Sequence, residues 1–270
     1  MNDMSSPTNE SAWKIRPFAE TLVALRFLTR LPLPFIRTLD LPPLAEAMRF
    51  FPLAGAVIGS ISAAALIAAG MLGLPSLLAA AIALAIGALV TGALHEDGLA
   101  DVADGFGGGT TREQRLEIMR DSRIGTYGTI ALLLTFIGKA AIYETLNGAD
   151  PITIIALLAS AAAFSRGLVV DLMWATRPAR SDGLSVFAGR PGKRSALFSL
   201  VSGGLGAVLA TSLMLSPAAA VVSMLAAFIV LAIMRALAMR QIGGQTGDVC
   251  GATQVLTELA MLAVYAAMIG

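Results

Sequence analysis

The sequence is short of charge, of aromatic residues, of cysteine and of histidine. Of its 270 residues, 14% are charged and 6% are aromatic, whereas a soluble domain carries about 25% charged residues. The single cysteine, Cys250, excludes an intrachain disulfide framework and any metal site built from several cysteines. The net charge of +1 gives no overall attraction for nucleic acid, so we expect no nucleic-acid partner.

Apolar residues are abundant instead, at 56% of the chain, and the mean hydropathy is +0.77. They gather in stretches of roughly membrane length, which predicts an all-α fold: a polytopic integral membrane helical bundle of about seven transmembrane helices in a lipid bilayer. The predicted spans are 51–73, 76–94, 128–147, 152–175, 195–215, 217–239 and 253–269.

The N-terminal region differs from the rest. Residues 1–12 are polar and lack the apolar core of a signal peptide, so we expect a disordered tail followed by one membrane-embedded catalytic domain, 13–270. The segment from Trp13 to Phe35 mixes basic and apolar residues. It is predicted to form an amphipathic helix at the membrane interface, stopped by LPLP at 31–34.

The distribution of basic residues predicts the orientation. Lysine and arginine gather in the loops 95–127 and 176–194, and Arg240 begins a third such loop, whereas the turns near 74, 149 and 216 have none. The positive-inside rule therefore places the long loops and the N-terminus in the cytoplasm, and seven spans would place the C-terminus outside.

The string HEDGLADVADGFGGG, 95–109, follows an uncharged apolar stretch. In a helix, Asp97, Asp101 and Asp104, at i, i+4 and i+7, share one face. Their mutual repulsion favours a hard divalent cation bound by oxygen ligands, such as Mg²⁺, and phosphate chemistry at a bilayer surface. A solvated helix end explains less well why every charge in the string is acidic and at helical spacing.

Neighbouring residues extend this candidate site. Glu96 lies about 100° around the helix from Asp97, which makes it a borderline metal ligand. Gly107 and Gly108 would let backbone N–H groups approach an oxyanion. His95, the only histidine, is interpreted as a proton acceptor, a metal ligand or an interfacial residue.

Three further segments are candidates. In LEIMRDSRIGTYG, 116–128, Arg120 and Arg123 suit a pyrophosphate, and Asp121 is a fourth metal carboxylate or orients Arg123; a surface ion pair is the alternative. In the glycine-rich segment 241–258, Thr246 and Asp248 sit where a tight loop would approach a ligand, and Asp248 is a further candidate metal ligand; a cytoplasmic turn between two spans is the alternative. The basic loop 177–194 fits either substrate binding or topology alone.

Charge inside a span costs about 2.5–3.5 kcal/mol per residue on insertion scales. Lys139 lies near the middle of its predicted span, so we expect it to face a polar cavity or an ion-pair partner, Asp171 or Glu144. Arg166 lies nearer a span end, from which it could snorkel.

Taken together, these strings resemble the cobalamin synthase family, the adenosylcobinamide-GDP ribazoletransferases. The matching segments, in order, are FLTRLPLP (27–34), FFPLAGAVIG (50–59), HEDGLADVADGFGGG (95–109), LEIMRDSRIGTYG (116–128), RPARSDGLS (177–185) and GGQTGDVCGA (243–252).

The resemblance implies a Mg²⁺-dependent transferase of the bacterial inner membrane. It would join adenosylcobinamide-GDP to α-ribazole or its 5′-phosphate and release GMP. For this reaction Asp97, Asp101, Asp104 and His95 are the candidate catalytic residues: the three aspartates would hold the metal, and His95 or one of the carboxylates would accept the hydroxyl proton. Substrate would contact Arg120, Arg123, Gly107, Gly108, Lys139, Arg180 and Thr246. The sequence leaves open a homo-oligomer or association with other corrinoid-pathway enzymes.

Two other functions are alternatives. The string Asp101-Val-Ala-Asp104-Gly105 echoes the CDP-alcohol phosphotransferases, but the Ala-Arg and the second acidic pair that should follow are missing. A divalent-cation transporter would place its carboxylates at mid-span, whereas these are predicted at a cytoplasmic end.

Overall fold

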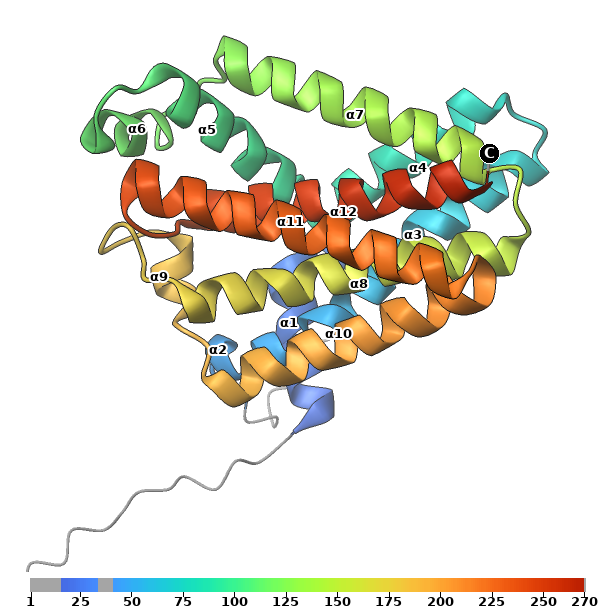
Figure 1. The fold of residues 1–270 in the computed structure, drawn as a ribbon, viewed down its shortest axis with the longest axis horizontal. Coiled ribbons are helices and arrows are strands. Elements are labelled where there is room, and N and C mark those ends of the chain that lie inside the picture. The colour runs from blue at the N-terminus through green and yellow to red at the C-terminus, as the bar shows by residue number, and fades with distance from the viewer. Residues whose placement is uncertain (1–15, 34–40, 270) are drawn as a thin grey trace, which may run out of the picture.

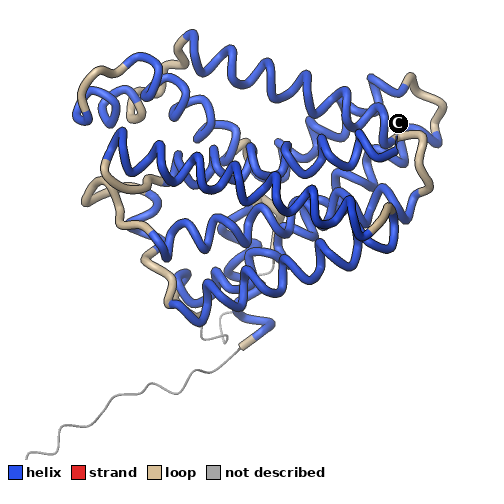
Figure 2. The backbone as a smooth tube through the Cα atoms, in the orientation of Figure 1, coloured by secondary structure: helices blue, strands red, loops and turns tan. Residues whose placement is uncertain are grey.

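A computed structural model describes residues 16–33 and 41–269, and this part of the chain contains helices and no β-strand (Figures 1 and 2). The predicted tail at 1–12 lies outside the described residues. The helices are α1 (Pro17–Leu28), α2 (Leu44–Ala47), η1 (Met48–Phe50), α3 (Phe51–Met71), α4 (Ser76–Thr91), α5 (Leu94–Gly108), α6 (Arg112–Ile118), α7 (Thr126–Leu146), α8 (Pro151–Ala175), α9 (Leu184–Ala188), α10 (Lys193–Met214), α11 (Pro217–Ile242) and α12 (Gly247–Ile269).

Six helical segments of the described chain are long and apolar enough to cross a membrane, and the α4–α5 pair makes a seventh if it counts as one broken span. The protein is therefore a multi-pass membrane bundle, as predicted. Helices α8 and α11 begin at Pro151 and Pro217. Asp150 and Ser216 precede these prolines and cap α8 and α11 by accepting hydrogen bonds from backbone N–H groups.

The predicted span 76–94 needs correction. Helix α4 has 16 residues, which at 1.5 Å per residue gives about 24 Å, less than the roughly 30 Å of a bilayer core. The chain then turns by 91° into α5. Gly92 and Ala93 make the turn at φ 67° and 57°, and a Cβ on Gly92 would also lie 2.1 Å from Nε of Arg30, so glycine is favoured there.

Helix α8 is the centre of the bundle and packs against α3, α10 and α12. Two glycines of α3 allow the closest approach. A Cβ on Gly55 or Gly59 would lie 2.3 or 2.4 Å from the carbonyl oxygen of Ala162 or Leu158 on α8. Small residues at helix crossings are typical of membrane bundles, where close backbone packing replaces the hydrophobic effect as the source of association.

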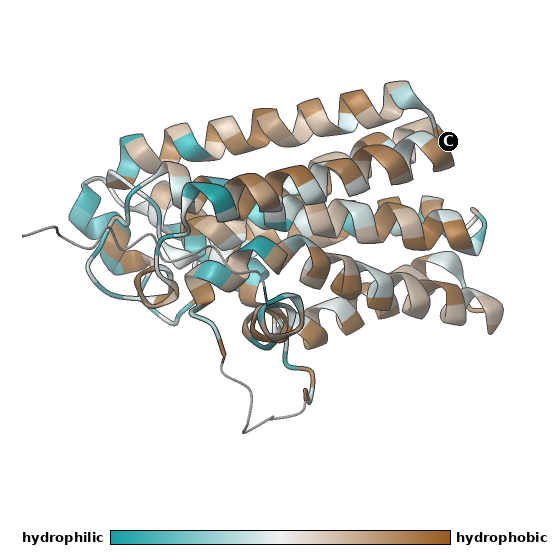
Figure 3. Cartoon of the chain, turned by 90° about the horizontal axis from the view of Figure 1, so that it is seen from below, coloured by the Kyte–Doolittle hydropathy of each residue, from teal (hydrophilic) through white to brown (hydrophobic). Residues whose placement is uncertain are grey.

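The helices are arranged so that the long loops share one end of the bundle, at the left in Figure 1, and the short turns share the other. Hydrophilic residues gather at the loop end, while the helix bodies are largely apolar (Figure 3). The acidic helix α5 runs from the interior of the bundle toward this loop end.

Helix α1 is shorter than the predicted 13–35 helix, because it begins at Pro17 and ends at Leu28, ahead of the prolines. It packs against α2, η1 and α3. Glu20 of α1 is fully buried and binds Arg49 of η1, with 2.5 Å between Oε2 and Nε. This pair joins the N-terminal helix to the bundle.

Candidate functional site

The acidic motif is helical, as predicted, and its three aspartates belong to α5. The carboxylate of Asp101 interacts electrostatically with those of Asp248, Asp97 and Asp104, and with the guanidinium of Arg180. The fold therefore adds a fourth carboxylate and one cation to the acidic face. Asp97 is exposed and Asp101 half-buried, so a ligand can reach both.

Asp104 has a structural role that the sequence reading missed. Its carboxylate accepts hydrogen bonds from the backbone N–H groups of Gly125, at 2.7 Å, and Gly128, at 2.9 Å. These two N–H groups lie at the N-terminal end of α7, and the N-cap residue of that helix is a glycine, which has no side-chain acceptor. A Cβ on either glycine would lie 2.4 Å from a carboxylate oxygen of Asp104. Asp104 thus supplies the missing cap of α7.

Helix α12 crosses α5 at close range, and this crossing places Asp248 beside the acidic face of α5. A Cβ on Gly98 would lie 2.8 Å from the backbone oxygen of Asp248, and one on Gly251 would lie 3.1 Å from Cα of His95. The side chain of Asp248 accepts a hydrogen bond from the hydroxyl of Thr246 at 3.1 Å. The glycine-rich segment is therefore a backbone contact surface for the acidic helix.

The basic loop is tied to the same segment by backbone pairing. The N–H of Gln245 donates to the carbonyl of Arg177, and the N–H of Ala179 donates to the carbonyl of Gln245, both at 2.8 Å. Arg112, in the first turn of α6, donates to the carbonyl oxygens of Ile242 and Ala179. Three segments far apart in sequence are thereby joined beside α5.

This pairing positions Arg180, the predicted substrate-binding residue of the basic loop. Its Nη2 lies 3.3 Å from Oδ2 of Asp248, and its side chain is 13% exposed. Its Nε and Nη1 are buried and have no acceptor among the described residues. Buried guanidinium nitrogens without a partner are costly, and an oxyanion ligand would satisfy them.

No group of three or more His, Cys, Asp or Glu side chains within the described residues is arranged to hold a metal ion. Proteins commonly bind Mg²⁺ without a complete protein cage, through one or two carboxylates, substrate phosphates and water. Asp97, Asp101 and Asp248 are hard oxygen donors whose carboxylates interact electrostatically with one another, and two of them would suffice for that pattern. Metal binding by these residues stays a prediction.

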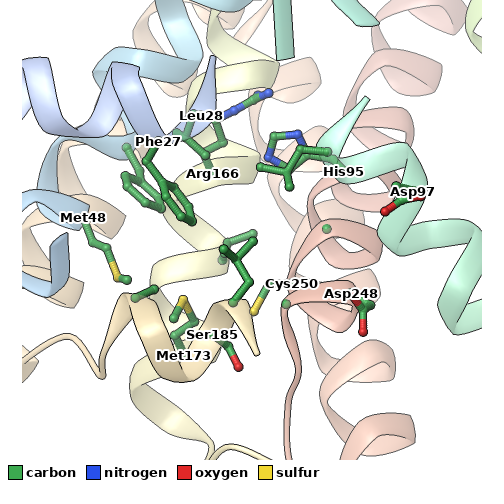
Figure 4. A pocket seen from close by; sticks show the side chains of 17 residues that line it. Phe27, Leu28, Met48, His95, Asp97, Arg166, Met173, Ser185, Asp248 and Cys250 are labelled. Atoms are coloured by element: carbon green, nitrogen blue, oxygen red, sulfur yellow. The ribbon is translucent and has the colours of Figure 1, made fainter. Parts of the chain in front are cut away.

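His95 and Glu96, adjacent in sequence, line two different cavities. His95 is buried and lines the larger one with Asp97 and Asp248 (Figure 4). Glu96 lines a second cavity of about 40 Å³ together with Lys139, Arg166 and Glu258. Glu96 is therefore directed away from the cavity that Asp97 and Asp248 share.

The second cavity confirms that Lys139 faces a polar cavity, and it corrects the partners expected for the charges within the spans. Lys139 pairs with Glu258 at 3.3 Å, not with Asp171 or Glu144. Arg166 is 3% exposed and lies 3.7 Å from the same carboxylate, so it does not snorkel. The sequence analysis missed Glu258. The available signal was its spacing, because Glu258 lies four residues after Gln254 and therefore on the same face of α12.

The predicted pyrophosphate arginines are engaged in exposed ion pairs. Arg120 binds Asp182 at 2.5 Å and Arg123 binds Asp121 at 2.6 Å. Hydrogen bonds from the side chain and the backbone of Arg123 lower the pKa of Asp121 to about 2. Of the two roles predicted for Asp121, this geometry favours orienting Arg123 over binding a metal.

Gly107 and Gly108 lie in the last turn of α5 rather than in a loop. In that position their N–H groups are directed at carbonyl groups of the preceding turn, so the structure gives no support to the predicted oxyanion contact. Gly107 has another reason to be glycine, since a Cβ there would lie 2.7 Å from the ring of Tyr127.

Comparison with known proteins places these residues in a family. The family model described as cobalamin-5-phosphate synthase matches residues 20–266. An adenosylcobinamide-GDP ribazoletransferase of Azorhizobium caulinodans is 46% identical, over 92% of this chain and 95% of its own length. Relatives with the same name in Rhizobium etli and in a Sinorhizobium species are 42% and 45% identical, over 94% and 90% of this chain and 98% and 94% of their own. No solved structure matches the chain. The chain belongs to the cobalamin-5-phosphate synthase family.

Proposed function

We propose that this protein is an adenosylcobinamide-GDP ribazoletransferase. It joins adenosylcobinamide-GDP to α-ribazole, or to α-ribazole 5′-phosphate, and releases GMP, which is the reaction named for its relatives. The observation that carries the proposal is the acidic face of α5 beside the unpartnered nitrogens of Arg180, because a pyrophosphate needs both cationic donors and charge-bridging ligands.

The reaction places particular demands on this site. A ribose hydroxyl attacks the phosphorus that stays with the corrinoid, the bond from that phosphorus to the GMP oxygen breaks, and the hydroxyl proton must be removed. Arg180 donates Nε and Nη1 to the pyrophosphate oxygens, and Asp248 holds the guanidinium through Nη2. His95, on the wall of the adjoining cavity, is the candidate acceptor of the proton.

Two carboxylates from among Asp97, Asp101 and Asp248 are proposed to hold Mg²⁺, with substrate phosphate and water as its other ligands. When bound, Mg²⁺ supplies positive charge that offsets the charge developing on the GMP oxygen. Asp104 belongs to this electrostatic group, but its oxygens already accept two backbone hydrogen bonds, so its larger contribution is to fix the start of α7.

The bacterial inner membrane is the proposed location, with the loop end of the bundle facing the cytoplasm. That orientation follows from the excess of arginine and lysine at this end. It also places the acidic site in the compartment that contains nucleotide substrates.

The test is a direct assay with the full-length protein in vesicles. Adenosylcobinamide-GDP and α-ribazole are supplied with and without Mg²⁺, and both the corrinoid product and GMP are measured. We expect equal amounts of corrinoid product and GMP, and neither without a divalent cation. Release of CMP from a CDP-alcohol substrate, or uptake of Mg²⁺ by the vesicles without any transfer, would overturn the proposal.

A further inference from the structure

The cavity beside His95 has two chemically different ends. It has a volume of about 140 Å³, and its walls come from α1, η1, α3, α5, α8, α9 and α12. Figure 4 shows Phe27 and Met48 at one end, Asp97 and Asp248 at the other, and Arg166 and His95 between them. A ligand that fills it must therefore be apolar at one end and polar at the other.

The apolar end is suited to a flat aromatic group. The rings of Phe27 and Phe51 lie nearly parallel, with planes 14° apart and centroids at 5.9 Å, and both line the cavity. Met48 and Met173 add polarisable thioethers to the same wall. Thioethers adapt to the shape of a ligand and make favourable contacts with aromatic rings.

The size also selects the ligand. An enclosed apolar cavity of about 150 Å³ binds one benzene ring. This cavity is of similar volume but partly open, so it admits a two-ring aromatic group only with part of that group at the opening, and it admits no macrocycle. The polar end reaches the carboxylates of Asp97 and Asp248, which we have proposed as metal ligands. A ring system held at the apolar end would leave an attached sugar beside the reacting phosphate.

We propose that this cavity binds the benzimidazole base of the nucleoside acceptor and directs its ribose toward the acidic helix. This inference rests on the proposed function, because it takes the acceptor from that reaction. The other aromatic base in the reaction, guanine, has several hydrogen-bonding groups, and those that faced Phe27, Phe51 and Met48 would be left unpaired, although Arg166, His95 and Ser185 also line the cavity. The methylated benzimidazole of α-ribazole has only one free ring nitrogen.

The binding experiment uses a matched pair of variants, Phe27→Leu and Phe198→Leu. Both phenylalanines are half-buried and pack against another phenylalanine, but Phe198 pairs with Phe50 and lines a separate groove over α3, α8 and α10. Leucine keeps apolar volume and removes the ring. Binding of α-ribazole to each protein is measured by titration calorimetry, and the KM of each substrate is measured in the transfer assay.

We expect Phe27→Leu to weaken α-ribazole binding and raise its KM about tenfold, because one ring stacking on a base contributes this much or more. The KM of adenosylcobinamide-GDP should change less than about twofold, and Phe198→Leu should change neither value. Free dimethylbenzimidazole should compete with α-ribazole and not with adenosylcobinamide-GDP. If Phe27→Leu fails to fold, Ala188→Leu narrows the same cavity from α9. It should likewise raise the KM of α-ribazole and leave the KM of adenosylcobinamide-GDP nearly unchanged.

The outcomes separate this inference from the proposed function. If wild-type protein transfers no nucleoside, the proposed function fails, while the calorimetric titrations still report whether the cavity binds the base. If transfer occurs and Phe27→Leu raises only the KM of adenosylcobinamide-GDP, the cavity holds the other substrate and the inference is wrong. Equal KM values in Phe27→Leu and wild type would overturn it as well.

Discussion

One carboxylate of the acidic motif serves the fold more directly than the others. Asp104 is buried and accepts the N–H groups of Gly125 and Gly128 at the start of α7, whereas Asp101 is half-buried and faces other carboxylates. Two aspartates three residues apart on one helix therefore differ in the free energy that each contributes to folding. Substituting each with asparagine separates the structural role from the chemical one.

We expect Asp104→Asn to lower the free energy of unfolding by about 2 kcal/mol, because the amide retains one acceptor and turns a donor toward a backbone N–H. Asp101→Asn should leave stability unchanged or slightly higher, since it relieves repulsion among carboxylates, yet it should reduce transfer about a hundredfold or more. Thermal unfolding in detergent and the GMP assay measure the two effects. Equal melting temperatures for the two variants would contradict the capping role of Asp104.

At the scale of elements, the crossing of α5 and α12 depends on glycines whose substitution outcomes can be ranked. A Cβ on Gly98 meets the backbone of Asp248 at 2.8 Å, whereas a Cβ on Gly108, in the same helix, meets only Cδ1 of Ile118 at 3.5 Å. We expect Gly98→Ala to cost about 1–3 kcal/mol and most of the activity, because the backbone of α12 must move. Gly108→Ala is the control and should be neutral or stabilising by up to about 1 kcal/mol. Full activity in Gly98→Ala would contradict this prediction, because it would show that the α5 and α12 backbones leave room for a Cβ at this position.

The break between α4 and α5 shows what sequence patterns could and could not predict. Hydropathy identified the long helices, because an apolar run of membrane length forms few structures other than a membrane-spanning helix. Helical spacing placed the aspartates on α5 correctly. The hydropathy pattern also predicted a span at 76–94, which is close to α4, but it did not show that α4 is shorter or that the chain turns by 91° into the acidic helix α5, because mean hydropathy carries no information about helix direction. The turn depends on a left-handed glycine, Gly92, and on the approach of Arg30, which is a tertiary contact.

The candidate site was predictable in its residue types and less so in its partners. Asp248 joins the acidic face, as the glycine-rich segment suggested, but the ion pairs of Lys139 and Arg166 were assigned wrongly or not at all. An ion pair within a helix follows from spacing along the chain. An ion pair between helices depends on their rotation about their axes, which apolar faces on nearly every side of a buried helix do not specify.

At the scale of the whole molecule, the second cavity joins four helices through charge. Glu96 of α5, Lys139 of α7, Arg166 of α8 and Glu258 of α12 line it together. Removing one member of a buried charge group leaves an uncompensated charge, which costs about 3–5 kcal/mol. We expect Glu258→Gln to reduce the yield and melting temperature of the protein strongly. Glu258→Gln combined with Lys139→Met, which restores the charge balance, should recover part of that loss. Equal melting temperatures for the single and double variants would show that the four charges do not act as a group.

The final prediction concerns the orientation of the bundle. The long loops lie at one end and the short turns at the other (Figure 1), and the arginine and lysine excess is at the loop end. Anchored positive charge is retained on the cytoplasmic side, so a cysteine at Thr110 should react with an impermeant thiol reagent only in inverted vesicles. A cysteine at Leu72, which is 78% exposed between α3 and α4, should react only in intact cells with a permeable outer membrane. Both cysteine variants are made in the Cys250→Ala protein, so that no native thiol can react; the native thiol is also buried. Labelling of Thr110→Cys from outside would reverse the orientation and place the nucleotide site on the wrong side of the membrane for its substrates.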